Sequence, residues 1–301
     1  MLGWRLVMSA ILVPALIALF WLDHRLGTSA YILLSFCLFI SVRNAFELTD
    51  LLSVRSIRPH FPATALFSSL VVLAGWAPQF FANNADYTPS ALLHSLGWIS
   101  AMMTVAFLAL LTLEATRYRE PGNSMESLGG NLLTVFYAGG LTAVTAQLRW
   151  FPNPHVGYFA IASMIICVKS GDTFAYSFGR LWGKRKLAPI LSPGKTQMGL
   201  VGAIVGSMLG GWLWLTFAGR LFDVSIAAGS PVNVLAYSAA MGLVGLVGDL
   251  CESLVKRDVE KKDSAILMPG FGGLLDLLDS PMFAGPFALV WWMLLPPAVP
   301  C

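Results

Sequence analysis

Charged residues are scarce in this 301-residue chain, where Asp, Glu, Lys and Arg make up 12% of the sequence. Soluble domains contain roughly 25%. So few charges do not cover the surface of a water-exposed globule of 32.5 kDa, which excludes an ordinary soluble enzyme and a disordered chain. Hydrophobic residues reach 56%, with a mean hydropathy of +0.71. They stand in long continuous runs, which are typical of membrane helices and not of the short alternating strands of a transmembrane barrel.

Cysteine and histidine are also sparse, with four residues of each. The cysteines form no C-x-x-C pair, so neither a disulfide framework nor a zinc site is expected. The histidines are dispersed and indicate no histidine-based metal site. The net charge of +3 is too small and too scattered for a nucleic-acid-binding protein, so no nucleic-acid partner is expected.

Long apolar runs divide the chain into candidate spanning segments, because an α-helix needs about 20 apolar residues to cross a ~30 Å hydrocarbon core. Nine such runs lie at 6–22, 26–42, 62–81, 95–113, 127–148, 154–168, 199–219, 231–248 and 281–298. The sequence therefore predicts an all-α polytopic membrane protein with about nine transmembrane helices.

The basic residues predict an orientation, since cytoplasmic loops of membrane proteins are enriched in Lys and Arg. With a cytoplasmic N-terminus, all 19 Lys and Arg residues except Arg25, Arg149 and Arg220 fall on the cytoplasmic side. The C-terminus then lies outside. If the source is bacterial, the membrane is the inner membrane.

The two halves of the chain differ in polarity. Residues 1–150 form the N-terminal transmembrane helices, and residues 151–301 form a C-terminal catalytic region with the predicted cytoplasmic loops 169–198 and 249–280. In the first half, Glu47 and Asp50 follow the second apolar run and are expected to mark a solvated helix end, with a minor supporting role in the site as the alternative.

The loop 169–198 joins a carboxylate to a glycine-punctuated basic run. Asp172 and Tyr176 are four residues apart and share one face if the preceding helix continues. Lys and Arg donate charge-assisted hydrogen bonds to phosphates. The same residues are typical of a loop that anchors to anionic lipid headgroups, and both interpretations stay open for the basic run alone.

The sequence Ser192-Pro193-Gly194-Lys195-Thr196 is not a P-loop, because Pro189 stands where that motif needs its first glycine. Before a helix, the turn is still able to direct backbone N–H groups and Lys195 towards a phosphate.

The loop 249–280 brings carboxylates to the ends of two apolar runs. Asp249, Glu252, Ser253 and Lys256 have i, i+3, i+4, i+7 spacing and line one helical face. Asp276 and Asp279 precede the last apolar run. Carboxylates at membrane depth are costly unless they are paired or bind a cation.

A hairpin of these two helices brings Asp249, Asp276 and Asp279 together. Carboxylate oxygens and substrate phosphates are the ligands that Mg²⁺ prefers. The sequence therefore predicts a Mg²⁺ site, open to a second cation, in preference to a network of Asp with Lys and Arg that only holds helices together.

The two loops together resemble the phosphatidate cytidylyltransferase (CDP-diacylglycerol synthase) family. The second loop matches the family signature at Ser253, Lys256, Arg257, Lys262, Asp263, Ala265, Pro269, Gly272, Gly273, Asp276 and Asp279. The first matches at Asp172, Tyr176, Gly179, Gly183, Lys184, Lys186, Leu187, Pro189, Ser192, Pro193, Lys195, Thr196 and Gly199. Phe271, Leu277 and Met198 replace a signature His, a signature Arg and an acidic residue, so the resemblance is to a divergent member.

The resemblance implies attack by the phosphate of phosphatidic acid on the α-phosphorus of CTP, which gives CDP-diacylglycerol and pyrophosphate. The catalytic candidates are Asp249, Asp276, Lys256, Lys262 and Asp263. The substrate-binding candidates are Asp172, Tyr176, Lys184, Lys186, Ser192, Lys195, Thr196, Ser253, Arg257, Gly272 and Gly273. The metal candidates are Asp249, Asp276 and Asp279, with Mg²⁺ as the cofactor.

Three other functions stay open at this point. They are a polyprenol- or phytol-type lipid kinase, a catalytically silent paralogue, and an ion-coupled transporter that uses the aspartates as its ion site. The expected partners of the enzyme are CTP, phosphatidic acid and membrane lipids, and the family resemblance alone implies a homodimer.

Overall fold

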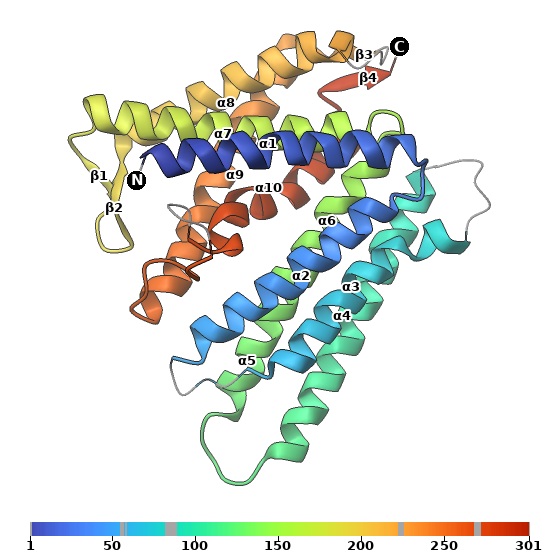
Figure 1. Cartoon of the computed structure of the whole chain (residues 1–301), viewed down its shortest axis with the longest axis vertical. Helices are drawn as coiled ribbons and strands as arrows, with labels where there is room; N and C mark the ends of the chain where they lie inside the picture. The colour runs from blue at the N-terminus through green and yellow to red at the C-terminus, as the bar shows by residue number, and fades with distance from the viewer. Residues whose placement is uncertain are drawn as a thin grey trace. The chain divides into compact units, whose positions relative to one another are not determined.

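The computed structural model describes residues 2–54, 57, 59–81, 89–221, 226–267 and 272–300. Over these ranges the chain is mainly α-helical (Figure 1). It divides into two compact units, of which the first comprises Met1–Gln147 with Asp258–Leu277 and the second Leu148–Arg257 with Leu278–Cys301. The last long helix, α10 (Leu274–Leu294), therefore begins in the first unit and continues in the second.

The first unit is a bundle of long helices. Its elements are α1 (Leu2–Arg25), α2 (Tyr31–Leu52), α3 (Phe61–Phe81), α4 (Pro89–Arg117), α5 (Ser124–Thr134), the π-helix η1 (Val135–Leu141) and α6 (Thr142–Ala146). Helix α3 packs between α2 and α4 (Figure 1).

A buried carboxylate fixes the start of α2. Asp23 is fully buried, and its Oδ1 accepts hydrogen bonds from the backbone N–H groups of Ile32 at 2.8 Å and Leu33 at 3.2 Å. The first N–H groups of a helix have no partner within the helix. Asp23 supplies that partner, while the residue before the helix, Ala30, has a φ of +54° that turns the chain into it.

The predicted run 127–148 is a helix interrupted by the π-helical turn η1. A Cβ on Gly139 would lie 2.7 Å from the Cα of Ser68, so α3 and η1 approach each other more closely than any side chain allows. Nearby, the Gln147 side chain donates a 3.2 Å hydrogen bond to the carbonyl of Gly75. This close contact of backbones holds the centre of the unit together.

The second unit is built around two helices that run side by side (Figure 1). Its elements are the 3-10 helix η2 (Gln147–Trp150), α7 (Gly157–Trp182), β1 (Lys186–Ala188), β2 (Ser192–Thr196), α8 (Gln197–Phe217), the 3-10 helix η3 (Ala218–Leu221), β3 (Ile226–Ala228), α9 (Pro231–Asp258), β4 (Ala298–Pro300) and the larger part of α10.

Small residues let α7 and α8 approach closely. A Cβ on Gly206 would lie 2.5 Å from the Cβ of Phe174, and one on Gly171 would lie 2.4 Å from the Ser207 hydroxyl. Such small residues are typical of helix interfaces in membranes. The antiparallel hairpin β1–β2, in which Lys186 faces Thr196, connects the two helices, and β3 pairs with β4 near the end of the chain.

Within the described ranges, seven helices are long and apolar enough to cross a membrane. They are α2, α3, α4 (from Ala91), α7, α8, α9 and α10. This confirms the predicted class of all-α polytopic membrane protein. Helix α1 covers the predicted run 6–22, and the elements from α5 to the 3-10 helix η2 (Gln147–Trp150) cover 127–148. The sides on which the N-terminus and C-terminus lie stay predictions.

Several helices extend beyond their apolar runs into polar sequence, and four of these extensions bear on the site. Helix α2 ends at Leu52, α7 at Trp182 and α9 at Asp258, while α10 already begins at Leu274. The expectation that Glu47 marks a solvated helix end is therefore wrong, because Glu47 lies within α2 and is fully buried. Its polar partners, described below, make that burial possible. Asp50 does lie near the helix end, with an exposed side chain.

Candidate active site

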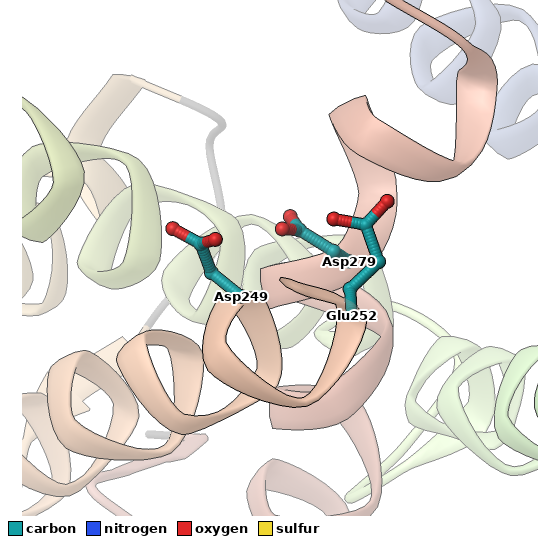
Figure 2. Close-up of side chains that lie close together, drawn as sticks. All are labelled: Asp249, Glu252 and Asp279. Atoms are coloured by element: carbon teal, nitrogen blue, oxygen red, sulfur yellow. The ribbon is translucent and has the colours of Figure 1, made fainter. Parts of the chain in front are cut away.

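Three carboxylates of the second unit converge at the meeting of α9 and α10. Asp249 and Glu252 come from α9 and Asp279 from α10 (Figure 2). One carboxylate oxygen of each lies within 4.8 Å of the others. Glu252 and Asp279 are buried, with 1% and 6% of their surface exposed, while Asp249 is half-buried. The cluster is thus least buried at Asp249.

The sequence brings the two helices close enough for this convergence. Asp249 and Glu252 are three residues apart on one helical face, as predicted. The preceding Gly248 lies against α10, because a Cβ there would stand 2.6 Å from the Cβ of Phe283 and 3.0 Å from the Asp279 carbonyl. A larger residue would push α10 and its carboxylate away from α9.

Two lysines neutralise part of the acidic charge. Lys195 Nζ lies 2.8 Å from Asp249 Oδ2, and Lys256 Nζ lies 2.6 Å from Glu252 Oε2. Ser253 donates a longer hydrogen bond of 3.4 Å to Asp249 Oδ1. Three carboxylates with two ammonium groups leave one formal negative charge, which favours a bound cation.

Helix α7 brings a further ion pair near the cluster. Lys169 Nζ lies 3.4 Å from Asp172 Oδ2, and both side chains are about two-fifths exposed, at 40% and 42%. The negative charge of Asp172 is close enough to Asp249 and Asp279 to repel both carboxylates. On the same continuous helix, the exposed Tyr176 accepts a 3.2 Å hydrogen bond from Arg180.

The hairpin β1–β2 positions Lys195 next to the cluster. Thr196 follows Lys195 and is the N-cap of α8, where its buried hydroxyl accepts a 3.0 Å hydrogen bond from the N–H of Gly199. A Ser, Thr, Asp or Asn cap of this kind stabilises a helix start by about 1 kcal/mol. This confirms that the turn Ser192–Thr196 precedes a helix, which begins at Gln197, two residues before the predicted apolar run 199–219.

The other residues predicted from the first loop lie on the hairpin or, for Lys184, just before its first strand. Lys184 and Lys186 are exposed, and Ser192 at the start of β2 is half-buried. The Nζ of Lys195 is thus brought to Asp249, whereas the side chains of Lys184 and Lys186 are exposed.

Asp276 belongs to the first unit, where donors surround one of its oxygens. Its Oδ2 accepts hydrogen bonds of 2.8 Å from the N–H of Ser264, the hydroxyl of Ser264 and the N–H of Gly273. Gly273 precedes the first residue of α10 and Asp276 is the third, so this is the carboxylate half of a capping box. Gly272 has a φ of +89°, which glycine adopts readily.

Glu47 is a second carboxylate in the same region. Its Oε1 accepts from the side chain of Arg43 at 2.9 Å and from the N–H of Leu274 at 3.0 Å. Its Oε2 accepts from the hydroxyl of Ser264 at 2.8 Å and from the N–H of Leu275 at 2.9 Å. Glu47 therefore ties α2 to the start of α10.

The remaining predicted residues lie close to these two groups along the chain. Arg257, Lys262 and Asp263 are exposed. Met198 is half-buried in the first turn of α8, and Leu277 lies in the first turns of α10. Phe271, which replaces the signature histidine, lies outside the described residues.

The cytidylyltransferase family has a sequence profile that matches residues 4–295 of this chain, nearly its whole length. The chain belongs to this family. The phosphatidate cytidylyltransferase of Staphylococcus haemolyticus is 30% identical over 249 residues, which cover 83% of the chain and 86% of the relative.

Two further relatives match over a shorter stretch. The phosphatidate cytidylyltransferases of Chlamydia trachomatis and Haemophilus influenzae are 37% and 36% identical over 134 and 135 residues, or 44% and 45% of this chain. The matched part spans less than half the length of these two relatives, at 43% and 46%.

The acidic cluster of this cytidylyltransferase family member has the donor chemistry of a Mg²⁺ site. Mg²⁺ binds carboxylate oxygens and leaves room for substrate phosphates, and Asp249, Glu252 and Asp279 supply such oxygens. Asp249 and Asp279 were predicted as ligands. Glu252 was placed on the same helical face without a ligand role, and its spacing of three residues from Asp249 is the signal that could have identified it. Asp276 as a ligand stays a prediction.

Glu47 was expected at a solvated helix end and is fully buried instead, whereas the alternative of a supporting role stayed open. Ser264 lies 217 positions away along the chain, so the sequence gives no indication that the two side chains are in contact. A carboxylate within the last turns of an apolar helix was the available signal, because burial of a charge requires partners.

Proposed function

We propose that the protein is a phosphatidate cytidylyltransferase, which converts CTP and phosphatidic acid to CDP-diacylglycerol and pyrophosphate. The observation that carries the proposal is the cluster of Asp249, Glu252 and Asp279 with Lys195 and Lys256 in a member of the cytidylyltransferase family. The names of the relatives support the same activity.

In this reaction, an oxygen of the phosphatidate phosphate attacks the α-phosphorus of CTP. The new P–O bond forms as the bond between the α-phosphorus and the bridging oxygen breaks, and the electron pair leaves on pyrophosphate. No strong base is needed, because a phosphate monoester with a second pKa near 6 is largely a dianion at neutral pH. The protein's task is to align the two phosphates and to neutralise their charge.

The carboxylate cluster and its lysines fit that task. Asp249, Glu252 and Asp279 would hold Mg²⁺, which supplies neutralisation of the triphosphate charge when bound. Lys195 is half-buried and pairs with Asp249, the least buried carboxylate of the cluster. The ammonium of Lys195 would donate a charge-assisted hydrogen bond to a phosphate oxygen of CTP.

A diacyl substrate explains why such a site is built on membrane helices. The acyl chains stay in the lipid, and the headgroup phosphate reaches polar side chains at the helix ends. We also propose that the site faces the cytoplasm, in the inner membrane of a bacterial source, because Lys and Arg concentrate in the loops that carry it. A homodimer belongs to the same proposal and is measured by the mass of the detergent-solubilised protein.

The experiment is an assay of the purified protein in detergent with CTP and phosphatidic acid, with and without Mg²⁺. Lipid product and pyrophosphate are followed together. The proposal expects equal amounts of CDP-diacylglycerol and pyrophosphate, formed only with the metal. Release of CDP without pyrophosphate would instead indicate a kinase, and folded protein without any product would contradict the proposal. Asp50→Asn serves as the control variant, because Asp50 is exposed and lies outside the cluster.

A further inference from the structure

Glu47 is a fully buried carboxylate on a helix of the N-terminal half that contacts the family signature segment. It lies on α2, which carries none of the predicted catalytic residues. A charged group that is fully buried requires several partners to balance the loss of hydration. Its four donors come from three places: Arg43 one turn earlier, Ser264, and the first two residues of α10.

The contact to α10 is that of a helix cap supplied by another helix. The N–H groups of Leu274 and Leu275 are the first two of α10, and they point at the two oxygens of Glu47 at 3.0 and 2.9 Å. A negative charge at this position also interacts favourably with the helix dipole. Glu47 therefore determines where α10 starts and in which direction its first turn leaves.

Gly273 makes the approach of Glu47 sterically possible. A Cβ on Gly273 would lie 2.2 Å from Glu47 Oε2 and 2.1 Å from the Ser264 hydroxyl. Neither atom is free to move away, since both are held by hydrogen bonds. Gly273 is the second glycine of the signature pair, and no larger residue fits there because the carboxylate of Glu47 occupies the space of a Cβ.

The hydroxyl of Ser264 links Glu47 to the signature aspartate. It lies 2.8 Å from Glu47 Oε2 and 2.8 Å from Asp276 Oδ2. The same Asp276 oxygen also accepts the backbone N–H of Ser264. A shift of Glu47 would therefore move Ser264, and through it the carboxylate of Asp276.

We propose that Glu47 is a positioning residue for the transfer reaction. It holds Ser264 and the first turn of α10, and it thereby fixes the carboxylate of Asp276. The inference rests on the proposed function for its effect on turnover, while its structural part rests only on the contacts above. Reaction rates are sensitive to such placement, and a displacement of about 1 Å can cost about 10²-fold.

The test compares Glu47→Gln with Asp50→Asn. Both substitutions remove one carboxylate of α2 that contacts the segment after α9, since Asp50 pairs with Lys261 at 3.2 Å. Asp50 is exposed, whereas Glu47 is buried. Glu47→Gln keeps the size of the side chain but offers an amide N–H₂ where an oxygen accepted hydrogen bonds. We measure kcat and KM for CTP per folded protein, the apparent Tm, and hydrogen exchange of peptides that contain Ser264 and Leu274–Leu275.

Positioning predicts a kcat of Glu47→Gln that is about 10²-fold lower, with KM for CTP within about threefold of the parent protein. Hydrogen exchange rises at Ser264 and at the first turn of α10 and stays unchanged elsewhere. Asp50→Asn leaves both measurements unchanged. If Glu47→Gln is folded and retains a kcat within about threefold of the parent value, the proposal is wrong. Faster exchange along the whole chain would equally contradict it, since it would indicate a general loss of stability.

Ser264→Ala provides a second test if Glu47→Gln does not fold. It removes only the hydroxyl that joins the two carboxylates, and we expect kcat to fall about tenfold. Combined with Glu47→Gln, its effect should be smaller than the product of the two single effects, because both act on one network. If the unchanged protein has no activity, the proposed function fails, and local hydrogen exchange in the two variants still decides whether Glu47 positions the segment.

Discussion

The two carboxylate networks of this protein differ in the donors that face them. In the first unit, Glu47 and Asp276 accept hydrogen bonds mainly from backbone N–H groups and a serine hydroxyl. In the second unit, Asp249 and Glu252 face the flexible side chains of lysines. Backbone donors are fixed by the helix and the turn that carry them, whereas a lysine ammonium moves without unfolding anything.

The two networks therefore suit different roles. A carboxylate held by backbone donors has little freedom to exchange its partners, so it determines where chain segments lie. A carboxylate held by a lysine can exchange the ammonium for a cation, and the freed lysine can bind a phosphate. The first network thus defines the arrangement of α2 and the start of α10, and the second has the exchangeable partners that the proposed metal and substrate binding requires.

Asp249→Asn and Asp276→Asn are expected to have the largest effects on turnover, and Asp249→Asn tests the cluster of the second unit. It removes a carboxylate of the acidic cluster and leaves Lys195 without its partner, so activity should fall on the order of 10³-fold. The apparent Tm should change little, because a partly exposed ion pair contributes about 0–1 kcal/mol. Both quantities are measured on detergent-purified protein. An activity within tenfold of the parent value would show that Asp249 is not part of the active site.

Asp276→Asn tests the other network and should affect both activity and stability. An amide in place of the carboxylate presents N–H₂ or a weaker acceptor to the donors at Ser264 and Gly273, which costs about 1–3 kcal/mol. We expect turnover to be abolished while the protein stays inserted in the membrane. Initial rates and thermal unfolding are compared with those of Asp249→Asn. Near-normal CTP consumption by the folded variant would exclude a role of Asp276 in the reaction.

Lys256→Met tests whether the cluster of the second unit binds a cation. The pair of Lys256 with Glu252 is buried, and removal of one partner of a buried pair costs about 3–5 kcal/mol. Added Mg²⁺ should restore a large part of the lost Tm, because a cation replaces the missing ammonium. The exposed neighbour Arg257 gives the control, since Arg257→Met should change stability by no more than about 0.5 kcal/mol. An equal response of both variants to Mg²⁺ would argue against a metal at Glu252.

Much of the fold follows from the sequence, because apolar runs of about 20 residues have few alternatives to a membrane helix. The ends of the helices did not follow. Helices α2, α7, α9 and α10 continue into polar sequence, where hydropathy no longer indicates a helix and tertiary partners decide. The interruption at η1 also depends on a tertiary contact, the close approach of Gly139 to Ser68.

The candidate site shows the same division. The spacing of Asp249, Glu252, Ser253 and Lys256 on α9 was predicted from the sequence, because helical periodicity is a local property. The contacts of Glu47 were not predictable, since they join positions 217 to 228 residues apart. A hydrophobicity pattern identifies which residues are buried but carries no information on which distant polar group meets a given carboxylate.

The smallest effect is expected from a charge at position 198, because that position belongs to one turn of a helix and not to a network. Met198 is the second residue of α8, next to the Thr196 cap and half-buried. The N-terminal turn of a helix carries partial positive charge, so Met198→Glu should stabilise by about 0.3–1 kcal/mol and Met198→Lys should destabilise by a similar amount. Activity of Met198→Glu should stay within about threefold of the parent value, since the position flanks the turn that presents Lys195 without belonging to the cluster.

Thermal unfolding of the three forms at low and high salt tests this prediction. At low salt the apparent Tm should be highest with Glu at position 198, intermediate with Met and lowest with Lys. The differences in Tm should become smaller at high salt, because salt screens the charges. A loss of expression in Met198→Glu would instead show that the side chain is packed in lipid or protein.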